Sequence, residues 1–395
     1  MTTSGKQSAA RQPGRADGAH IAGDQPAAKV IRVSSPASLL AAVPVVLKFE
    51  PSEPSIVVLG TAPPRSAVAI TLRYDISDPR YADAIARHSA GVLVAQGIET
   101  VHVVGYGPGD LVTPVADALR AKFAEAGITV RELLRVQESR YWSYVCTDPA
   151  CWPPEGKPFN VKTHPITRKY ANRVLASREA LASAVASVTG DAADSMRQAT
   201  RTAEKRAARL VGRANRSRSR VTRRRALLQP GLKAVADALK LYREGGRFES
   251  HEDAAWLALV LEDLRIRDDA WARMDPEHRN AHLRLWTDLT TLARPGYAAA
   301  PASLLAFTAW QDGDGALGNV ALDRALADNP NYSMALLLRE ALDAGAPPSM
   351  ARMPMTPEEV AAAYDSAEES EQPAGHSGQA VSDTAPDGAL AVTPV

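Results

Sequence analysis

The sequence has few cysteines and no long apolar segment. Two cysteines in 395 residues are too few for a disulfide scaffold. No apolar run approaches the ~20 residues of a transmembrane helix, and the N-terminal segment lacks the apolar stretch of a secretory signal. We therefore expect a cytoplasmic protein with no membrane association.

Strong net charge and catalytic motifs are also missing. The formal net charge is +1 and aromatic residues make up 5% of the chain, so no global field favours nucleic acid or a membrane surface. The sequence contains no Gly-x-Ser-x-Gly motif, and no Ser–His–Asp or Cys–His arrangement can be proposed. It therefore offers no catalytic residues, no cofactor and no metal site, and it favours a binding protein over an enzyme.

The first part of the chain alternates between strand and helix patterns. Short apolar runs at 55–60 and 101–104 fit buried strands, and amphipathic stretches follow them. This order predicts an α/β domain over residues 29–165, with a mixed sheet that is parallel at its centre and antiparallel at its edges. Residues 1–28 lack any period, so we expect a disordered tail there.

The strand signals stop near residue 166, and residues 166–348 predict an all-helical domain. One or two long helices are expected here, with the basic part over 192–228 and a break near Pro230-Gly231. Residues 301–345 resemble a single tetratricopeptide-type helical hairpin, which has to pack on other helices because one repeat is not stable alone. Such a hairpin favours another protein as partner. Residues 349–395 are expected to be largely disordered.

An aromatic-rich hairpin is predicted just before the change to helices. A two-residue turn at 138–139 would pair the strand ending at Gln137 with the segment RYWSYVC that begins at Arg140. One face would then carry cations and rings. These residues are Arg131, Arg135, Arg140, Trp142 and Tyr144. The face suits a small anionic or planar ligand, or it packs beneath the helical domain with the arginines covering the ring edges.

A glycine-rich loop, GYGPGD, links a predicted strand to a predicted helix and contains Gly105, Gly107 and Gly109. Backbone N–H groups at a helix start can hold a phosphate, so a small anion is again a candidate ligand. The spacing matches neither the phosphate-binding loop nor the dinucleotide fingerprint. A tight loop with Asp110 as helix N-cap explains the segment equally well.

The two cysteines, Cys146 and Cys151, lie in a proline-stiffened loop. They are either a redox pair or two small apolar fillers. His164 follows them, but a fourth zinc ligand of the usual kind is missing. His278 and His282 share one helix face without a third ligand, and we expect ordinary surface or interface residues there.

A basic block covers residues 197–225, where about a dozen Arg and Lys residues stand against the single acidic residue Glu204. Such a block either neutralises nucleic-acid phosphates or lies solvated against an acidic surface. The candidate nucleic-acid residues are Arg213, Arg216, Arg218, Arg220, Arg223, Arg224 and Arg225.

Four stretches carry a resemblance to a known family. They are SPASLLAAVPVVLKFEPSEPSIVVLG, RYWSYVCTDPACWPPEG, the ASREAL start that follows, and APASLLAFTAWQDGDGALGNVALDRALADNPNYSMALLL. Together they resemble the actinobacterial family called domain of unknown function 4192, over almost the whole expected ordered chain. The family is uncharacterised, so the resemblance implies no catalytic residues. It usually has Cys-Cys-Pro where this chain has Cys151-Trp152-Pro153, which puts a role for that third cysteine in doubt.

Three functional classes stay open. A non-catalytic binding or regulatory protein that contacts another protein through its helical domain ranks highest. The second class is an enzyme or sensor that binds a small phosphate or nucleotide-like ligand at the sheet edge. The third is a nucleic-acid-binding protein that uses the basic helix.

Overall fold

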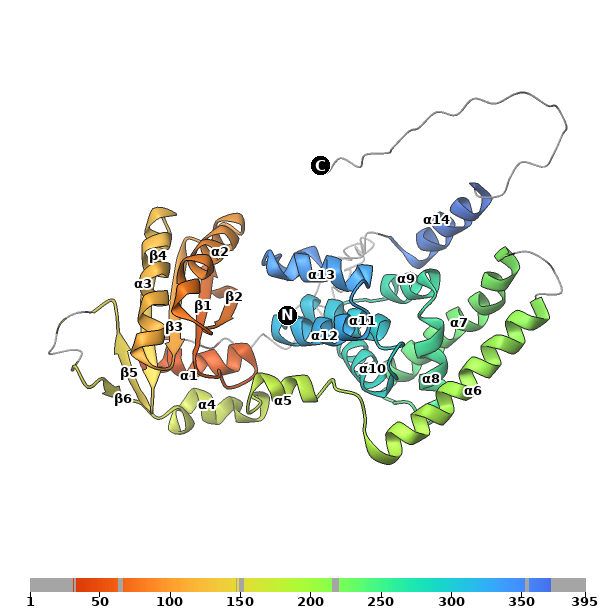
Figure 1. Ribbon diagram of the computed structural model, residues 1–395, viewed down its shortest axis with the longest axis horizontal. Coiled ribbons are helices and arrows are strands. Elements are labelled where there is room, and N and C mark those ends of the chain that lie inside the picture. The colour runs from red at the N-terminus through yellow and green to blue at the C-terminus, as the bar shows by residue number, and fades with distance from the viewer. Residues whose placement is uncertain are drawn as a thin grey trace, which may run out of the picture.

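The computed structural model describes residues 31, 33–62, 67–146, 148, 153–214, 220–351 and 355–370. Figure 1 shows an N-terminal α/β lobe and a larger helical lobe, which confirms the predicted fold class. No helix among these residues combines the length and apolar character needed to cross a bilayer.

The α/β lobe is built on one six-stranded sheet in the order β2-β1-β3-β4-β5-β6. Only β3 and β4 pair in parallel, at the centre of the sheet, and the other neighbours are antiparallel. The strands are β1 (Ser55–Ala62), β2 (Ala67–Asp75), β3 (Thr100–Tyr106), β4 (Thr129–Gln137), β5 (Arg140–Ser143) and β6 (Lys157–Pro158).

Two helices cover one face of the sheet and a third covers the other. α2 (Ala82–Ala95) and α3 (Gly109–Glu125) pack on Val103 and Leu133, forming a core that belongs to this lobe alone. On the opposite face, α1 (Pro36–Leu47) packs on Val104 and Leu134, and that core continues without a break into the helical lobe. The two lobes therefore share one hydrophobic core through α1.

α1 forms because strong local signals agree with its burial. The Ser35 side chain accepts the amide of Ser38, and the Ser38 hydroxyl accepts the amide of Ser35, which completes a capping box. Pro36 stands at the first helical position, where its missing N–H has no consequence. The helix is apolar nearly all round, as expected for a helix enclosed on more than one side.

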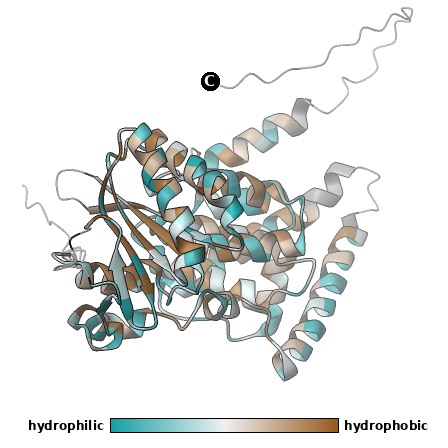
Figure 2. Cartoon of the chain, turned by 60° about the vertical axis from the view of Figure 1, so that its left-hand side comes forward, coloured by the Kyte–Doolittle hydropathy of each residue, from teal (hydrophilic) through white to brown (hydrophobic). Residues whose placement is uncertain are grey.

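The helical lobe is arranged around α11 (Ala299–Gln311), in which Ala299 to Trp310 are all buried. The segment expected to resemble a tetratricopeptide hairpin, residues 301–345, thus includes the central helix of the lobe. It does not stand as a repeat in a solenoid. Figure 2 shows the strands of the sheet as mainly hydrophobic. The other helices are α4 (Pro165–Tyr170), α5 (Arg178–Ser183), α6 (Gly190–Ala214), α7 (Arg220–Arg243), α8 (His251–Val260), α9 (Leu264–Ala272), α10 (Arg279–Leu292), α12 (Gly315–Asp328), α13 (Ser333–Asp343) and α14 (Pro357–Ser370).

The predicted helix break near Pro230 is wrong. α7 continues through this position, and Gly231 allows Ile266 of α9 to pack closely, where a Cβ would meet the isoleucine at 2.3 Å. The basic segment, expected as one or two long helices, forms α6 and α7. α14 lies within the tail that was expected to be largely disordered, and a capping box between Thr356 and Glu359 begins it. Residues 1–28 lie outside the described residues.

Polar contacts fix the two lobes where α1 ends. The Lys48 ammonium lies 2.6 Å from the Asp314 carboxylate of the helical lobe. One residue further, Phe49 forms a β-bridge with Leu175, and Leu175 donates its amide to the Lys48 carbonyl at 2.8 Å. The end of α1 is therefore held by both main-chain and side-chain bonds to later segments.

Asp314 also accepts the amide of Leu317 at 3.0 Å and so caps α12. Asp314→Ala removes the cap and the ion pair, and we expect it to lower the free energy of unfolding by about 1–2 kcal/mol. Asp314→Asn keeps an N-cap acceptor, and because Lys48 is 42% exposed the lost pair should cost less than about 1 kcal/mol. Urea unfolding measures both variants, and equal losses would contradict a capping role.

Candidate functional site

The predicted hairpin register is confirmed by the structure. Residues 138 and 139 have φ of 49° and 62°, as a two-residue hairpin turn requires. Gln137 opposes Arg140, and Arg135 opposes Trp142. The Arg135 guanidinium consequently stacks on the Trp142 ring, with 3.7 Å between Cζ and the ring centroid.

The glycine-rich loop and the hairpin, predicted as separate sites, meet at Arg135. Its Nη1 donates to the Gly107 carbonyl at 3.3 Å and to the Gln137 Oε1 at 2.7 Å. A Cβ at Gly109 would lie 3.6 Å from the Arg135 Cζ, so the guanidinium rests against the start of α3. Gly105 needs to lack a side chain because Val112 fills that space.

Asp110 is not the N-cap of α3, contrary to the alternative reading of the glycine loop. Pro108 takes the N-cap position with extended backbone angles, and no side chain caps the helix. The carboxylate of Asp110 lies instead in the first turn, where it interacts favourably with the helix dipole.

The aromatic face is covered by its own loop and by α3. The Trp142 Nε1 donates to the Pro154 carbonyl at 2.9 Å, and the Arg140 Nη1 donates to the Gly156 carbonyl at 2.7 Å. The Tyr144 hydroxyl lies 2.6 Å from the Thr113 hydroxyl of α3. The face is therefore packed under residues 153–156 and α3. In the described parts of the chain, none of these side chains forms a hydrogen bond, an ion pair or a ring contact with the helical lobe.

Arg131 does not share this face, which corrects the sequence prediction. The pairing of β4 with β3 shifts between Val101 and His102, and Arg131 is the extra residue of this β-bulge. Val130 and Leu133, three positions apart, therefore both pack into the core beneath α2 and α3. Arg131 is exposed, and its charge, after the larger effect of burial, lowers the pKa of His102.

The cysteine loop is described only in part. Cys146 is a half-buried free thiol, and its amide donates to the Ser143 Oγ at 3.1 Å, which turns the chain out of β5. Cys151 lies outside the described residues, so the redox pair stays a prediction. His164 caps α4 through its Nδ1, which accepts the Ile166 amide. No group of three or more His, Cys, Asp or Glu residues in the described parts of the chain is arranged to hold a metal.

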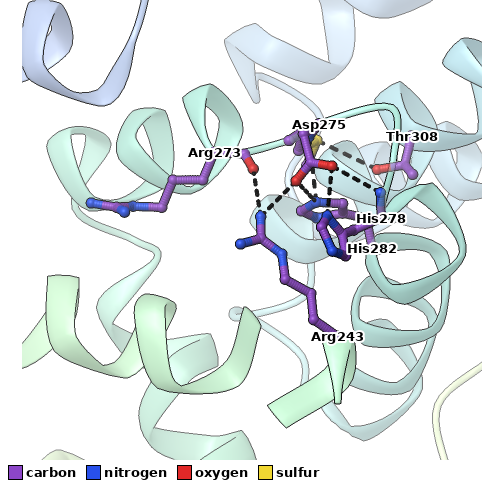
Figure 3. A network of polar contacts seen from close by, with 7 residues as sticks. Arg243, Arg273, Asp275, His278, His282 and Thr308 are labelled. Atoms are coloured by element: carbon purple, nitrogen blue, oxygen red, sulfur yellow. Dashed lines mark hydrogen bonds and ion pairs between the residues drawn. The ribbon is translucent and has the colours of Figure 1, made fainter. Parts of the chain in front are cut away.

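The histidine pair of α10 belongs to a polar network between helices (Figure 3). The Asp275 carboxylate lies 2.8 Å from the His278 Nδ1 and 2.7 Å from the Arg243 guanidinium. His282 is buried, and its Nε2 accepts the Asp275 amide at 3.4 Å. Burial lowers the pKa of His282 to about 4, although the charge of Asp275 acts in the opposite direction.

A pocket of about 720 Å³ lies between α6, α7 and α8. Its apolar lining includes Leu241, Phe248, Trp256 and Leu257. Arg206 of α6 stands over the buried Trp256 ring, with 3.9 Å between Cζ and the ring centroid. Sequence reasoning missed this pocket because Arg206 and Trp256 lie fifty positions apart. The one local signal is the small residues Ala199, Ala203 and Ala207 at helical spacing on α6, which mark its packing face.

The basic block begins on the same helix. Arg213 is exposed near the end of α6, whereas Arg216 and Arg218 lie outside the described residues. The backbones of Arg220, Arg223, Arg224 and Arg225 lie in the first turns of α7. The block thus covers most of α6 and the first turns of α7, two helices that flank the pocket.

These features define a two-lobed protein in which an α/β lobe and a helical lobe share one core, with a helical pocket next to a basic segment. The family model described as Domain of unknown function (DUF4192) matches residues 36–349, so the chain belongs to that family. The match covers both lobes but ends before α14. No curated protein and no solved structure matches the chain.

The contact between Gly156 and Trp142 gives a matched pair of variants. Gly156 has a φ of 76° and a Cβ there would lie 2.5 Å from the Trp142 ring, whereas Gly127 has a φ of 74° with open space around it. Gly127→Ala should lower the free energy of unfolding by about 1–2 kcal/mol, because alanine is strained in this left-handed backbone conformation. Gly156→Ala should cost about 1–3 kcal/mol more, because the stacked ring has to move. Urea unfolding compares them, and equal losses would show that the loop does not pack on Trp142.

His282 predicts a pH dependence of stability. Its folded pKa of about 4 lies below the ordinary value of 6.5, so the unfolded chain binds the proton more readily. The contribution of neutral His282 to the free energy of unfolding is complete above pH 6.5 and is lost as the pH falls toward 4. At pH 5 the free energy of unfolding should be lower by about 2 kcal/mol. His282→Gln keeps an acceptor for the Asp275 amide but does not titrate. Unfolding free energies at pH 7 and pH 5 should differ less in this variant, and an unchanged difference would contradict the assignment.

Proposed function

We propose that this protein binds another protein through its helical lobe. The observation that carries the proposal is the pocket of about 720 Å³ between α6, α7 and α8. Its lining is largely apolar and also contains two cations and two carboxylates, Arg206, Lys233, Asp237 and Asp253. A pocket of this kind accepts several apolar side chains from one face of an amphipathic helix.

The charge next to the pocket indicates which residues the partner helix carries. Arg206, Arg209 and Arg213 follow each other at helical spacing along α6, and all three are exposed. A partner helix seated in the pocket extends along this row. Carboxylates on its flank would pair with the arginines, so the expected partner segment is amphipathic and acidic.

Arg209 and Arg213 of α6 differ from several other exposed cations, including Arg197 at the start of the same helix, which pairs with Asp194. Arg87, Arg120 and Lys233 each form an ion pair with an aspartate three or four positions away on the same helix. Within the described residues, no carboxylate forms an ion pair with Arg209 or Arg213. Unpaired cations beside an apolar pocket support an acidic partner over a purely solvated helix face.

The other two classes have less support. Nucleic acid is attracted to the same arginines, but an apolar floor has no counterpart on a phosphate backbone. At the sheet edge, Arg135 already uses its Nη1 donors and its ring-stacking face within the protein. Glu53 also lies at that edge, and burial together with the charge of Glu138 raises its pKa. A negative group there disfavours an anionic ligand.

Site-specific photo-crosslinking tests the proposal. A photoreactive amino acid replaces Lys233 in the full chain, and the crosslinked material from native cells is identified by mass spectrometry. We expect one protein, joined through an acidic amphipathic segment. Arg206→Glu should reduce the yield at least tenfold, because it reverses the charge at the pocket.

Lys205→Glu is the matched control, since it makes the same charge change one position away, on a residue that does not line the pocket. This variant should keep most of the yield. Equal losses in both variants would point to a diffuse charge effect. Crosslinks that disappear after nuclease treatment would instead assign the surface to nucleic acid.

A further inference from the structure

α14 differs from the other helices of the helical lobe in how it is attached. It lies beyond the matched family region, and Figure 1 shows it at the edge of the lobe beside α9, leading to the C-terminus. Among its described side chains only Val360 is fully buried, whereas nearly every residue of α11 is. The attachment therefore rests on little apolar surface, and hydrophobic burial is the main force that would hold such a helix.

Polar contacts supply much of the attachment to α9. The Tyr364 hydroxyl donates to the Asp268 Oδ2 at 2.7 Å. The Arg265 guanidinium lies 2.7 Å from the Asp365 carboxylate, and the Arg265 side chain is only 11% exposed. Each contact joins α14 directly to α9. Because the Asp365 side chain is 56% exposed, its ion pair can exchange readily with another pair.

The carboxylate that pairs with Arg265 comes from α14. The two nearby arginines, Arg267 and Arg273, pair with Asp268 and Asp269 of α9 itself. Within the described chain, Asp365 is the only carboxylate that forms an ion pair with Arg265. Removal of α14 would leave the Arg265 guanidinium without this carboxylate and free to pair with a carboxylate of another helix.

The α14 sequence shows what chemistry this surface selects. It contains Glu358, Glu359, Asp365, Glu368 and Glu369 and no Lys or Arg. Val360 and Tyr364 lie four positions apart, on one helix face. α14 is thus an acidic amphipathic helix whose apolar side and one carboxylate match the α9 surface.

We infer that α14 is a detachable strap and that the α9 surface beneath it is a second docking site, which binds an acidic amphipathic helix of a partner protein when α14 leaves. The occupant has an apolar residue, an aromatic hydroxyl four positions later and a carboxylate directly after it. α14 keeps the surface occupied until a competing helix of this chemistry displaces it. The inference rests on residues outside the α6–α8 pocket, so it stands independently of the proposed function.

A peptide with the sequence of residues 355–370, labelled with a fluorophore, tests the inference in binding assays with the full chain. Val360→Asp in the chain should release α14 and open the surface. The peptide should bind this variant at least tenfold more tightly than the unaltered chain, in which α14 competes. A second substitution, Arg265→Ala, should remove most of that gain.

Three controls keep the result decisive. Circular dichroism melting checks that the Val360→Asp chain stays folded, and a peptide that carries aspartate at Val360 should not bind. Trp256→Ala, which alters the pocket between α6 and α8, should leave peptide binding unchanged. Equal binding to both chains, or no binding to a folded Val360→Asp chain, would overturn the inference.

Discussion

The burial of α1 between the sheet and the helical lobe is the interaction on which the rest of the structure depends. Its apolar side chains close one face of the sheet and continue into the core of the helical lobe. The chain leaving α1 is then fixed by the Phe49 bridge to Leu175 and by the Lys48 pair with Asp314. Because one core serves both lobes, the sheet face beneath α1 and the helical lobe bury their apolar surfaces together.

Charge is distributed unevenly over this shared framework. Residues 197–225 hold twelve Arg and Lys against one Glu, a charge of +11, so the other residues sum to −10 within the net +1. The basic residues lie on the helices that flank the pocket, while Asp365 of α14 supplies a carboxylate to Arg265 of α9. A protein with balanced composition therefore still carries strong local charges.

Local signals predicted local structure well. The turn at 138–139 fixed the pairing of Arg135 with Trp142, because a two-residue turn leaves only one register. The position of Arg131 was not predictable in this way, since the bulge arises from the pairing of β4 with β3, a distant strand. Pro230 was misjudged for a similar reason: packing of α9 on Gly231 supports a helix that propensity alone would end.

The sequence by itself determined the order of elements, the α/β-to-helical change, the hairpin register and the family, because each depends on residues close together in the chain or on motifs in series. The tertiary structure alone decided that Arg135 joins the glycine loop to Trp142, that Arg206 stands over Trp256, and that α14 rests on α9. These contacts join segments far apart in sequence, and such segments meet only when burial of the common core brings them together.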